Sequence, residues 1–259
     1  MLKNNEKPTL SINEFVDKVY VLSVKTFTKR IAHIKSEMHK HAIDFQFIFN
    51  HDIPEIDPKT LVQLFSTSCT LTMAQKSLVL KHIDAWRDAA FNNYKRVLIF
   101  EDDVVLNKDF YVYFKRIIES TNQLKAGYLV FLGGTDAKVP DHYLLSNETI
   151  VALPIATAEG YITDLTAIKR RLDWLQKNKT TLPADHLIRD IDKELNIANY
   201  WSRKSIVEQG SVTGIFGSEL DSHRLKHSKL FNISRYHWNK FQRHYLRLWF
   251  AKFRQKFYP

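Results

Sequence analysis

Short apolar runs alternate with amphipathic segments over the first 200 residues, and this alternation restricts the possible fold more than any other feature. The apolar runs have the length and composition of strands, whereas the segments between them repeat apolar residues at helical spacing. Such alternation is typical of an α/β sandwich with a mostly parallel central sheet. We predict strands at 18–23, 45–49, 96–100, 128–132 and 149–153, and helices at 26–42, 73–90, 109–120 and 164–176, with a further helix opening at Pro183.

The predicted strand at 96–100 ends abruptly in three acids, Glu101, Asp102 and Asp103. Ligands of open α/β sheets bind outside the carboxyl ends of the strands. Adjacent carboxylates repel one another unless a cation compensates, and their oxygens suit Mg²⁺ or Mn²⁺. Because such an ion would bridge the phosphates of a nucleotide, the triplet predicts metal–phosphate chemistry. An acidic turn without a function is the alternative.

The composition excludes several classes of protein. The 259 residues are 44% hydrophobic and 25% charged, which is typical of a globular protein with a full core. The single cysteine, Cys69, excludes a disulfide framework and a multi-cysteine metal site. No apolar run reaches membrane-spanning length, and residues 1–15 lack the apolar core of a signal peptide, so we expect a cytoplasmic protein.

The basic charge is concentrated at the C-terminus. Residues 221–259 contain ten Lys and Arg residues and one acid, while the net charge of the whole chain is +10. We therefore separate a domain at 1–220 from a basic tail at 221–259. Aromatic residues recur in the tail at spacings of three and four, which predicts one helical stripe: Trp238, Phe241, Tyr245, Trp249 and Phe253.

A helix with an aromatic stripe and flanking cations is typical of an anionic membrane interface. Docking of the stripe on the protein's own body is the alternative interpretation. We expect no nucleic-acid partner, because no recognition motif accompanies the tail.

The segment 71–110, LTMAQKSLVLKHIDAWRDAAFNNYKRVLIFEDDVVLNKDF, resembles the signature of the family-25 glycosyltransferases. These are bacterial sugar transferases of lipooligosaccharide and lipopolysaccharide biosynthesis. In that family a helix with a pair like Lys81-His82 precedes a strand that ends in Glu-Asp-Asp. Further segments follow in family order: VYVLSVKTFTKR at 19–30, AEGYITDLTAI at 158–168, PADH at 183–186 and VEQ at 207–209.

The resemblance implies a GT-A fold and transfer of a sugar, galactose or another hexose, from a UDP-sugar to a hydroxyl of a cell-surface glycan, with inversion. A Mn²⁺ or Mg²⁺ ion would neutralise charge on the departing diphosphate, and a base would take the proton of the acceptor hydroxyl. The expected acceptor is a lipid-linked saccharide, for instance of lipopolysaccharide. We therefore expect the protein to be peripheral on the inner face of the cytoplasmic membrane.

With these matches as a guide, we assign roles to individual residues. Glu101, Asp103 and His186 are the expected metal ligands, and Asp185 is the expected base, with Glu159 as the second candidate. Each role has a structural alternative, such as an acid at a helix start for Asp185 and a tight turn for the glycines. The expected donor-binding residues are Arg30, Asp102, Gly133, Gly134 and Gln209.

Three other functions stay open. A phosphoryl-transfer or receiver protein also gathers acids around Mg²⁺, although a receiver places its acid pair after the first strand. A basic binding protein without catalysis would act through the tail and would not need Asp103. A catalytically inactive transferase-like module fits the first loop, because Ser23-Val24 departs from the usual Asn-Leu of the family.

Overall fold

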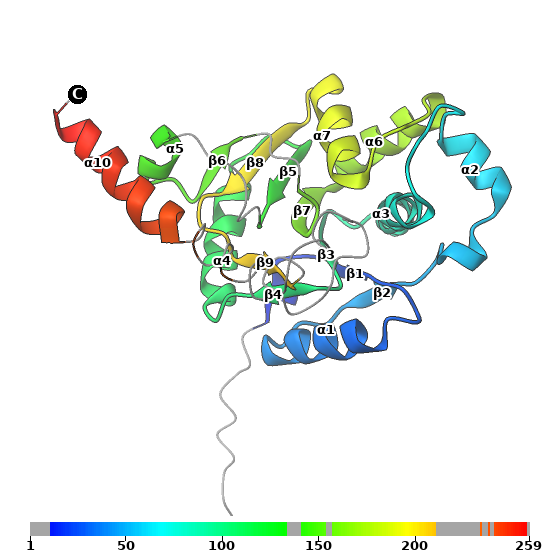
Figure 1. The fold of residues 1–259 in the computed structure, drawn as a ribbon, viewed down its shortest axis with the longest axis horizontal. Coiled ribbons are helices and arrows are strands. Elements are labelled where there is room, and N and C mark those ends of the chain that lie inside the picture. The colour runs from blue at the N-terminus through cyan, green and yellow to red at the C-terminus, as the bar shows by residue number, and fades with distance from the viewer. Residues whose placement is uncertain are drawn as a thin grey trace, which may run out of the picture.

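A computed structural model describes residues 11–133, 141–153, 157–210, 234, 238 and 241–257. Its centre is a seven-stranded sheet in the order β2-β1-β3-β7-β5-β8-β6, with helices packed around it (Figure 1). The strands are β1 Lys18–Leu22, β2 Gln46–Ile48, β3 Arg96–Glu101, β5 Tyr128–Phe131, β6 Ile150–Ala152, β7 Gly160–Asp164 and β8 Ala198–Ser202. The helices are α1 Thr28–Lys40, α2 Pro58–Leu64, α3 Met73–Phe91, α4 Phe110–Thr121, α5 Asp141–Leu145, α6 Leu165–Lys177, α7 Ala184–Glu194 and α10 Leu248–Phe257.

Five of the seven described strands of this sheet run in the same direction. β1 pairs in parallel with both β2 and β3, and β5 pairs in parallel with β8. β7 lies antiparallel between β3 and β5, and β6 is antiparallel to β8 at the edge. The predicted α/β class with a mostly parallel sheet is therefore confirmed.

The sheet is buried on both faces, because its central strands alternate their side chains between two hydrophobic cores. Val97 and Ile99 of β3 pack in a core with α3, α6 and α7. Leu98 and Phe100 of the same strand pack in a second core with α1 and α4. This double burial explains why β3 reads as a continuous apolar run rather than as an alternating pattern.

The predicted elements agree with the structure to within two or three residues at their ends. Side-chain caps begin the helices α2, α3 and α6. Thr72 and Gln75 form a capping box at α3, and the Asp164 carboxylate accepts a hydrogen bond from the backbone N–H of Ala167 at α6. Pro183 is the N-cap of α7 and lies just before its first turn.

Four of the described strands were not predicted. The fully buried β7 was missed, and it is the strand that separates the parallel β1–β3 group from β5 and β8. β8, which pairs with β5, was also missed. A second sheet pairs β4 (Val104–Leu106) with β9 (Val207–Gln209) in antiparallel register. All of these pairings join segments that are far apart in sequence, which local periodicity does not report.

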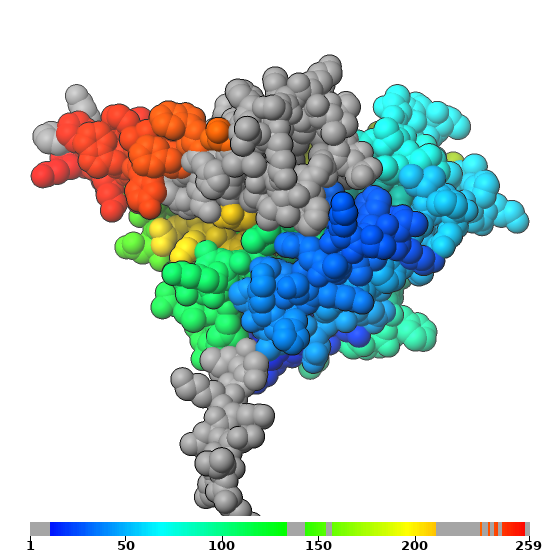
Figure 2. Space-filling view, turned by 60° about the horizontal axis from the view of Figure 1, so that its bottom comes forward, coloured from blue at the N-terminus to red at the C-terminus, as the bar shows by residue number. Residues whose placement is uncertain are grey.

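The described part of the tail consists of a π-helical segment, Gln242–Arg247, and α10. Figure 2 shows this orange and red segment at one edge of the molecule. The expected boundary at residue 220 lies outside the described residues. Within the described ranges, none of the helices combines the length and the apolar character needed to cross a bilayer.

Candidate active site

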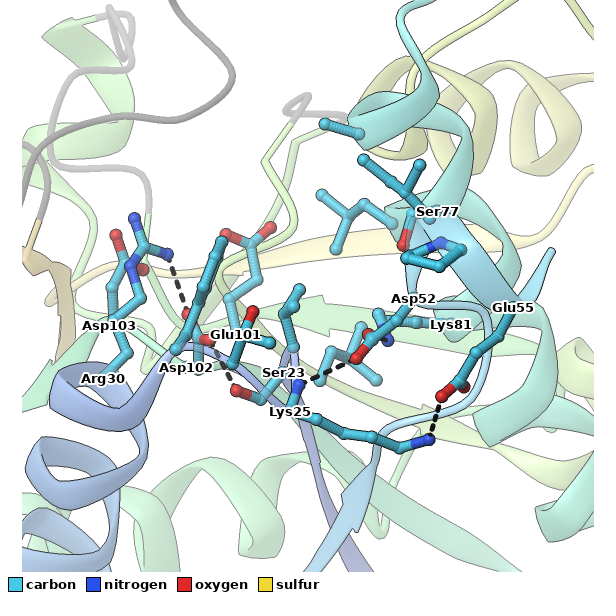
Figure 3. A pocket seen from close by; sticks show the side chains of 18 of the residues that line it. Ser23, Lys25, Arg30, Asp52, Glu55, Ser77, Lys81, Glu101, Asp102 and Asp103 are labelled. Atoms are coloured by element: carbon cyan, nitrogen blue, oxygen red, sulfur yellow. Dashed lines mark hydrogen bonds and ion pairs between the residues drawn. The ribbon is translucent and has the colours of Figure 1, made fainter.

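A cavity of about 430 Å³ opens at the carboxyl ends of the parallel strands β1, β2 and β3 (Figure 3). This is the position at which open α/β sheets bind ligands. Four parts of the chain form its wall: the loop at 23–27 after β1, the loop at 52–55 after β2, the first half of α3, and the acidic triplet after β3. Gln209 of β9 completes the lining.

One side of the cavity is organised by Asp102. Its carboxylate accepts hydrogen bonds from Ser23 Oγ at 2.7 Å and from Arg30 Nη1 at 2.8 Å, and all three residues are largely buried. The guanidinium of Arg30 also lies 5.4 Å from the ring centroid of Phe27. Burial opposes the charge of Arg30, but the nearby Asp102 and Asp103 outweigh it and raise its pKa. Asp102 therefore fixes a permanently charged guanidinium at the cavity wall.

The opposite side is organised by Lys81, whose side chain is 3% exposed. Its Nζ donates to the carbonyl oxygens of Phe49 and Asn50 and to Asp52 Oδ1 at 2.7 Å. The second oxygen of Asp52 accepts a hydrogen bond from the backbone N–H of Lys25. These bonds attach the loop after β2 both to α3 and to the loop after β1, so the cavity wall is held in place before any ligand arrives.

Glu101 is the electrostatic centre of the site. Removal from bulk water raises its pKa well above the ordinary value, and the carboxylates of Asp103, Glu159, Asp102 and Asp185 raise it further. These residues come from three separate segments of the chain. The fold thus gathers four carboxylates closely enough to Glu101 for each to raise its pKa, at considerable electrostatic cost.

The donor set fits a divalent ion that is shared with a substrate. Five acidic and three basic residues line the cavity, so the acids are in excess by two. No three His, Cys, Asp or Glu side chains of the described segments form a complete metal cage. Mg²⁺ usually takes one or two carboxylates together with substrate phosphates rather than a cage of protein ligands. Glu101 and Asp103, which both line the cavity, meet that requirement.

Gly133 and Glu159, two of the predicted site residues, lie against each other. A Cβ atom at Gly133 would stand 2.1 Å from Glu159 Oε1 and 2.7 Å from its Cδ. Glu159 is 8% exposed, and its backbone oxygen accepts the N–H of Glu101 at 3.0 Å. The glycine at the end of β5 is therefore needed to leave room for a buried carboxylate beside the acidic triplet.

Asp185 and His186 occupy the first turn of α7. Asp185 is 37% exposed at its side chain, accepts the backbone N–H of His186, and is close enough to raise the pKa of Glu101. His186 is 46% exposed, with Nε2 3.9 Å from Asp185 Oδ2. In the described part of the chain, His186 does not join Glu101 and Asp103 in one ligand set.

The remaining predicted residues divide between the site and the undescribed part of the chain. Gln209 Nε2 donates to Glu101 Oε2 at 3.3 Å, and the backbone N–H of Gly210 donates to the carbonyl oxygen of Asp103. The pairing of β9 with β4 produces both contacts. Gly134 lies outside the described residues.

Sequence reasoning did not identify Lys81, Asp52 and Ser23 as parts of the site. A lysine on the apolar face of an otherwise amphipathic helix is a signal that would have found Lys81, since buried lysines need acceptors. Its neighbour His82 lies in the core with Trp86, where both contact the hydroxyl of Tyr161. Both therefore have a packing role in the core.

Two comparisons connect this chain with known proteins. A family model described as "Glycosyltransferase family 25 (LPS biosynthesis protein)" matches residues 16–188. The chain is also similar to "Lipooligosaccharide biosynthesis protein lic2B" of Haemophilus influenzae, with 24% identity over 180 residues. That alignment covers 65% of this chain and 66% of the relative, so it spans just under two thirds of the relative's length. Because the family model covers more than half of the chain, including the strand–acid motif and the start of α7, this protein belongs to glycosyltransferase family 25.

Proposed function

We propose that this protein transfers a sugar, galactose or another hexose, from a UDP-sugar to a hydroxyl of lipopolysaccharide or another cell-surface glycan, with inversion. Family membership supports the reaction class, and the name of the Haemophilus relative supports a glycan product. The single observation that carries the proposal is the acid-lined cavity at the ends of β1, β2 and β3. A cavity there has the position and the charge for a nucleotide held through a metal ion.

Glu101 and Asp103 would hold the metal, Mn²⁺ or Mg²⁺, which when bound supplies positive charge against the departing diphosphate. The guanidinium of Arg30 lies beside these acids and would face the same phosphates. Gln209 would orient Glu101 through its amide hydrogen bond. Stabilising negative charge on the leaving group is the largest task of such a site.

We assign Asp185 as the base that takes the proton of the acceptor hydroxyl, and Glu159 as the second candidate. Asp185 is partly exposed at the start of α7, so its carboxylate is accessible to an acceptor saccharide. Glu159 is buried behind Gly133, a position that favours orienting or screening the metal ligands. Each carboxylate lies close enough to Glu101 to raise its pKa, and this proximity to an expected metal ligand supports both as candidates for the base.

A lipid-linked saccharide is the acceptor that this function requires. Such an acceptor is presented at a membrane surface, so we also propose that the protein works as a peripheral protein on the inner face of the cytoplasmic membrane.

The test is a screen of UDP-sugars with and without Mn²⁺, read by thermal stability and by sugar transfer. A true donor stabilises the native protein by mass action. Asp103→Asn should abolish the metal-dependent part of this stabilisation and lower turnover at least about a hundredfold. Asp173→Asn on the exposed face of α6 is the matched control and should change neither.

Three results would contradict the proposal. Full turnover by Asp103→Asn would remove the acidic triplet from the mechanism. Metal-dependent donor binding without transfer to any acceptor would assign the chain as an inactive transferase-like module. Release of phosphate without transfer of a sugar would favour a phosphoryl-transfer protein.

A further inference from the structure

The described part of the tail exposes six large aromatic side chains, which we call the aromatic ridge. Their exposed fractions lie between 45% and 67%, although rings of this size are usually buried. Contiguous exposed apolar patches mark surfaces that bind a partner or a membrane. The ridge consists of Trp238, Phe241, Tyr245, Trp249, Phe250 and Phe253.

The helix that carries half of the ridge is attached to the body by its other side. α10 packs against α5, next to which it lies in Figure 1, and its buried residue is Ala251, at 2% exposure. At 3.6 residues per turn, Trp249 and Phe253 lie on the side of the helix away from Ala251. The small residue thus faces the protein while the large rings point outward, which argues against docking of the stripe on the protein's own body.

The rings contact one another in two groups. Trp238 stacks on Phe241, which contacts Tyr245, while Trp249 contacts both Phe250 and Phe253. Tyr245 of the first group lies in the π-helical segment, whose turn is wider than that of an α-helix, so the two groups do not follow the single α-helical stripe predicted from sequence. Both groups remain exposed, and together they form a preorganised apolar surface.

Cations flank the ridge on both sides. On α10, Lys252 and Lys256 lie to one side of Trp249 and Phe253, and Arg254 lies to the other, and all three cations are exposed. Across residues 221–259, ten cations against one acid give a net charge of +9. Two copies of such a tail would repel each other, which disfavours self-association through the ridge.

We infer that the aromatic ridge inserts into the interface of an anionic lipid bilayer. Aromatic rings are favoured at the level of the lipid headgroups, and cations beside them pair with anionic headgroups. The ridge would hold the proposed transferase at the membrane surface, and this role of the ridge rests on the proposed function. Binding to a bilayer requires no turnover, however, so the two proposals fail separately.

The experiment measures cosedimentation of the full chain with vesicles of phosphatidylcholine, with and without phosphatidylglycerol, at low and high salt. We expect binding only to the anionic vesicles and weaker binding at high salt. Trp249→Ala with Phe253→Ala should lower the partition coefficient at least about tenfold. Lys252→Glu with Lys256→Glu should lower it at least about twentyfold, because each lost cation accounts for about fivefold.

Matched controls separate this surface from general stickiness. Phe91→Ala removes an aromatic ring that is 86% exposed at the end of α3, and Lys59→Glu with Lys115→Glu changes the net charge equally on exposed positions elsewhere. Both controls should bind vesicles like the wild type. Urea unfolding of every variant shows that the fold is retained.

Equal binding by the ridge variants and the wild type would overturn the inference. Concentration-dependent dimerisation that Trp249→Ala with Phe253→Ala abolishes, without vesicle binding, would reassign the ridge to a second copy of the chain. Binding of single-stranded DNA that the same variant abolishes, again without vesicle binding, would reassign it to nucleic acid. Sugar transfer to a soluble acceptor is measured in parallel and should be unchanged in the ridge variants.

Discussion

Replacing Gly133 by alanine tests whether the buried carboxylate of Glu159 belongs to the site. The added Cβ would stand 2.1 Å from Glu159 Oε1 and 2.8 Å from its Cγ, where ordinary contacts need more than 3.4 Å. The side chain of Glu159 must therefore move by more than an ångström, or the end of β5 must shift. Overpacking of this kind costs about 1–3 kcal/mol of unfolding free energy.

The effect on stability should disappear when the colliding side chain is removed. In the Glu159→Ala background the three atoms nearest to the added Cβ are absent, so Gly133→Ala should change the unfolding free energy by only about a few tenths of a kcal/mol. A double-mutant cycle by urea unfolding therefore measures a coupling of about 1–3 kcal/mol. This measurement does not depend on the identity of the substrate.

Turnover should follow the same cycle. A displacement of about 1 Å in a catalytic group costs about a hundredfold in rate, so Gly133→Ala should lower kcat by about that factor, or about 2.7 kcal/mol. The double variant should be no slower than Glu159→Ala alone. Additive losses in both cycles would refute the contact, and a coupling in stability without one in turnover would remove Glu159 from the catalytic machinery.

Three further predictions concern buried charge. Arg171→Leu should lower the free energy of unfolding by about 3–5 kcal/mol, because it leaves the buried Asp192 without the guanidinium that binds it at 2.6 and 2.7 Å. Replacing both residues should cost less. Urea unfolding of the single and double variants measures both effects. Glu101→Gln should stabilise the metal-free protein at neutral pH, because the raised pKa of Glu101 makes its ionised form unfavourable in the folded state. In thermal melting this gain should vanish as the pH falls below 4.5, the pKa of the residue in the unfolded chain. A loss of stability at neutral pH would contradict the prediction. Burial and the nearby Arg171 lower the pKa of His82 from 6.5 to about 3, so His82 stays neutral in the folded protein. As the pH falls from 6.5 to about 3, protonation of His82 in the unfolded chain should lower the free energy of unfolding by about 1.4 kcal/mol per pH unit. In His82→Asn, the free energy of unfolding, measured by urea at a series of pH values, should fall less steeply over this range.

Much of the fold followed from local sequence alone. The apolar run of β3 predicts a strand that is buried on both faces of a sheet. The residues Thr72 and Gln75 form a local capping box at the start of α3. The break from Phe100 to Glu101 marks the end of a buried strand, and in a parallel sheet that end is where ligands bind. The acidic triplet could therefore be located, and a metal proposed for it, before any coordinates were known.

The tertiary structure decided which residues meet at that strand end. β7 enters antiparallel beside β3 and carries Glu159 to the triplet, and β9 pairs with β4 and carries Gln209 there. The collision that makes Gly133 necessary, and the attachment of Lys81 to the loop after β2, also depend on these distant pairings. The periodicity of apolar residues in a segment shows which of its own side chains are buried, which is a local property. Which segments become neighbours depends on how all the faces are buried together, and that is a property of the whole chain.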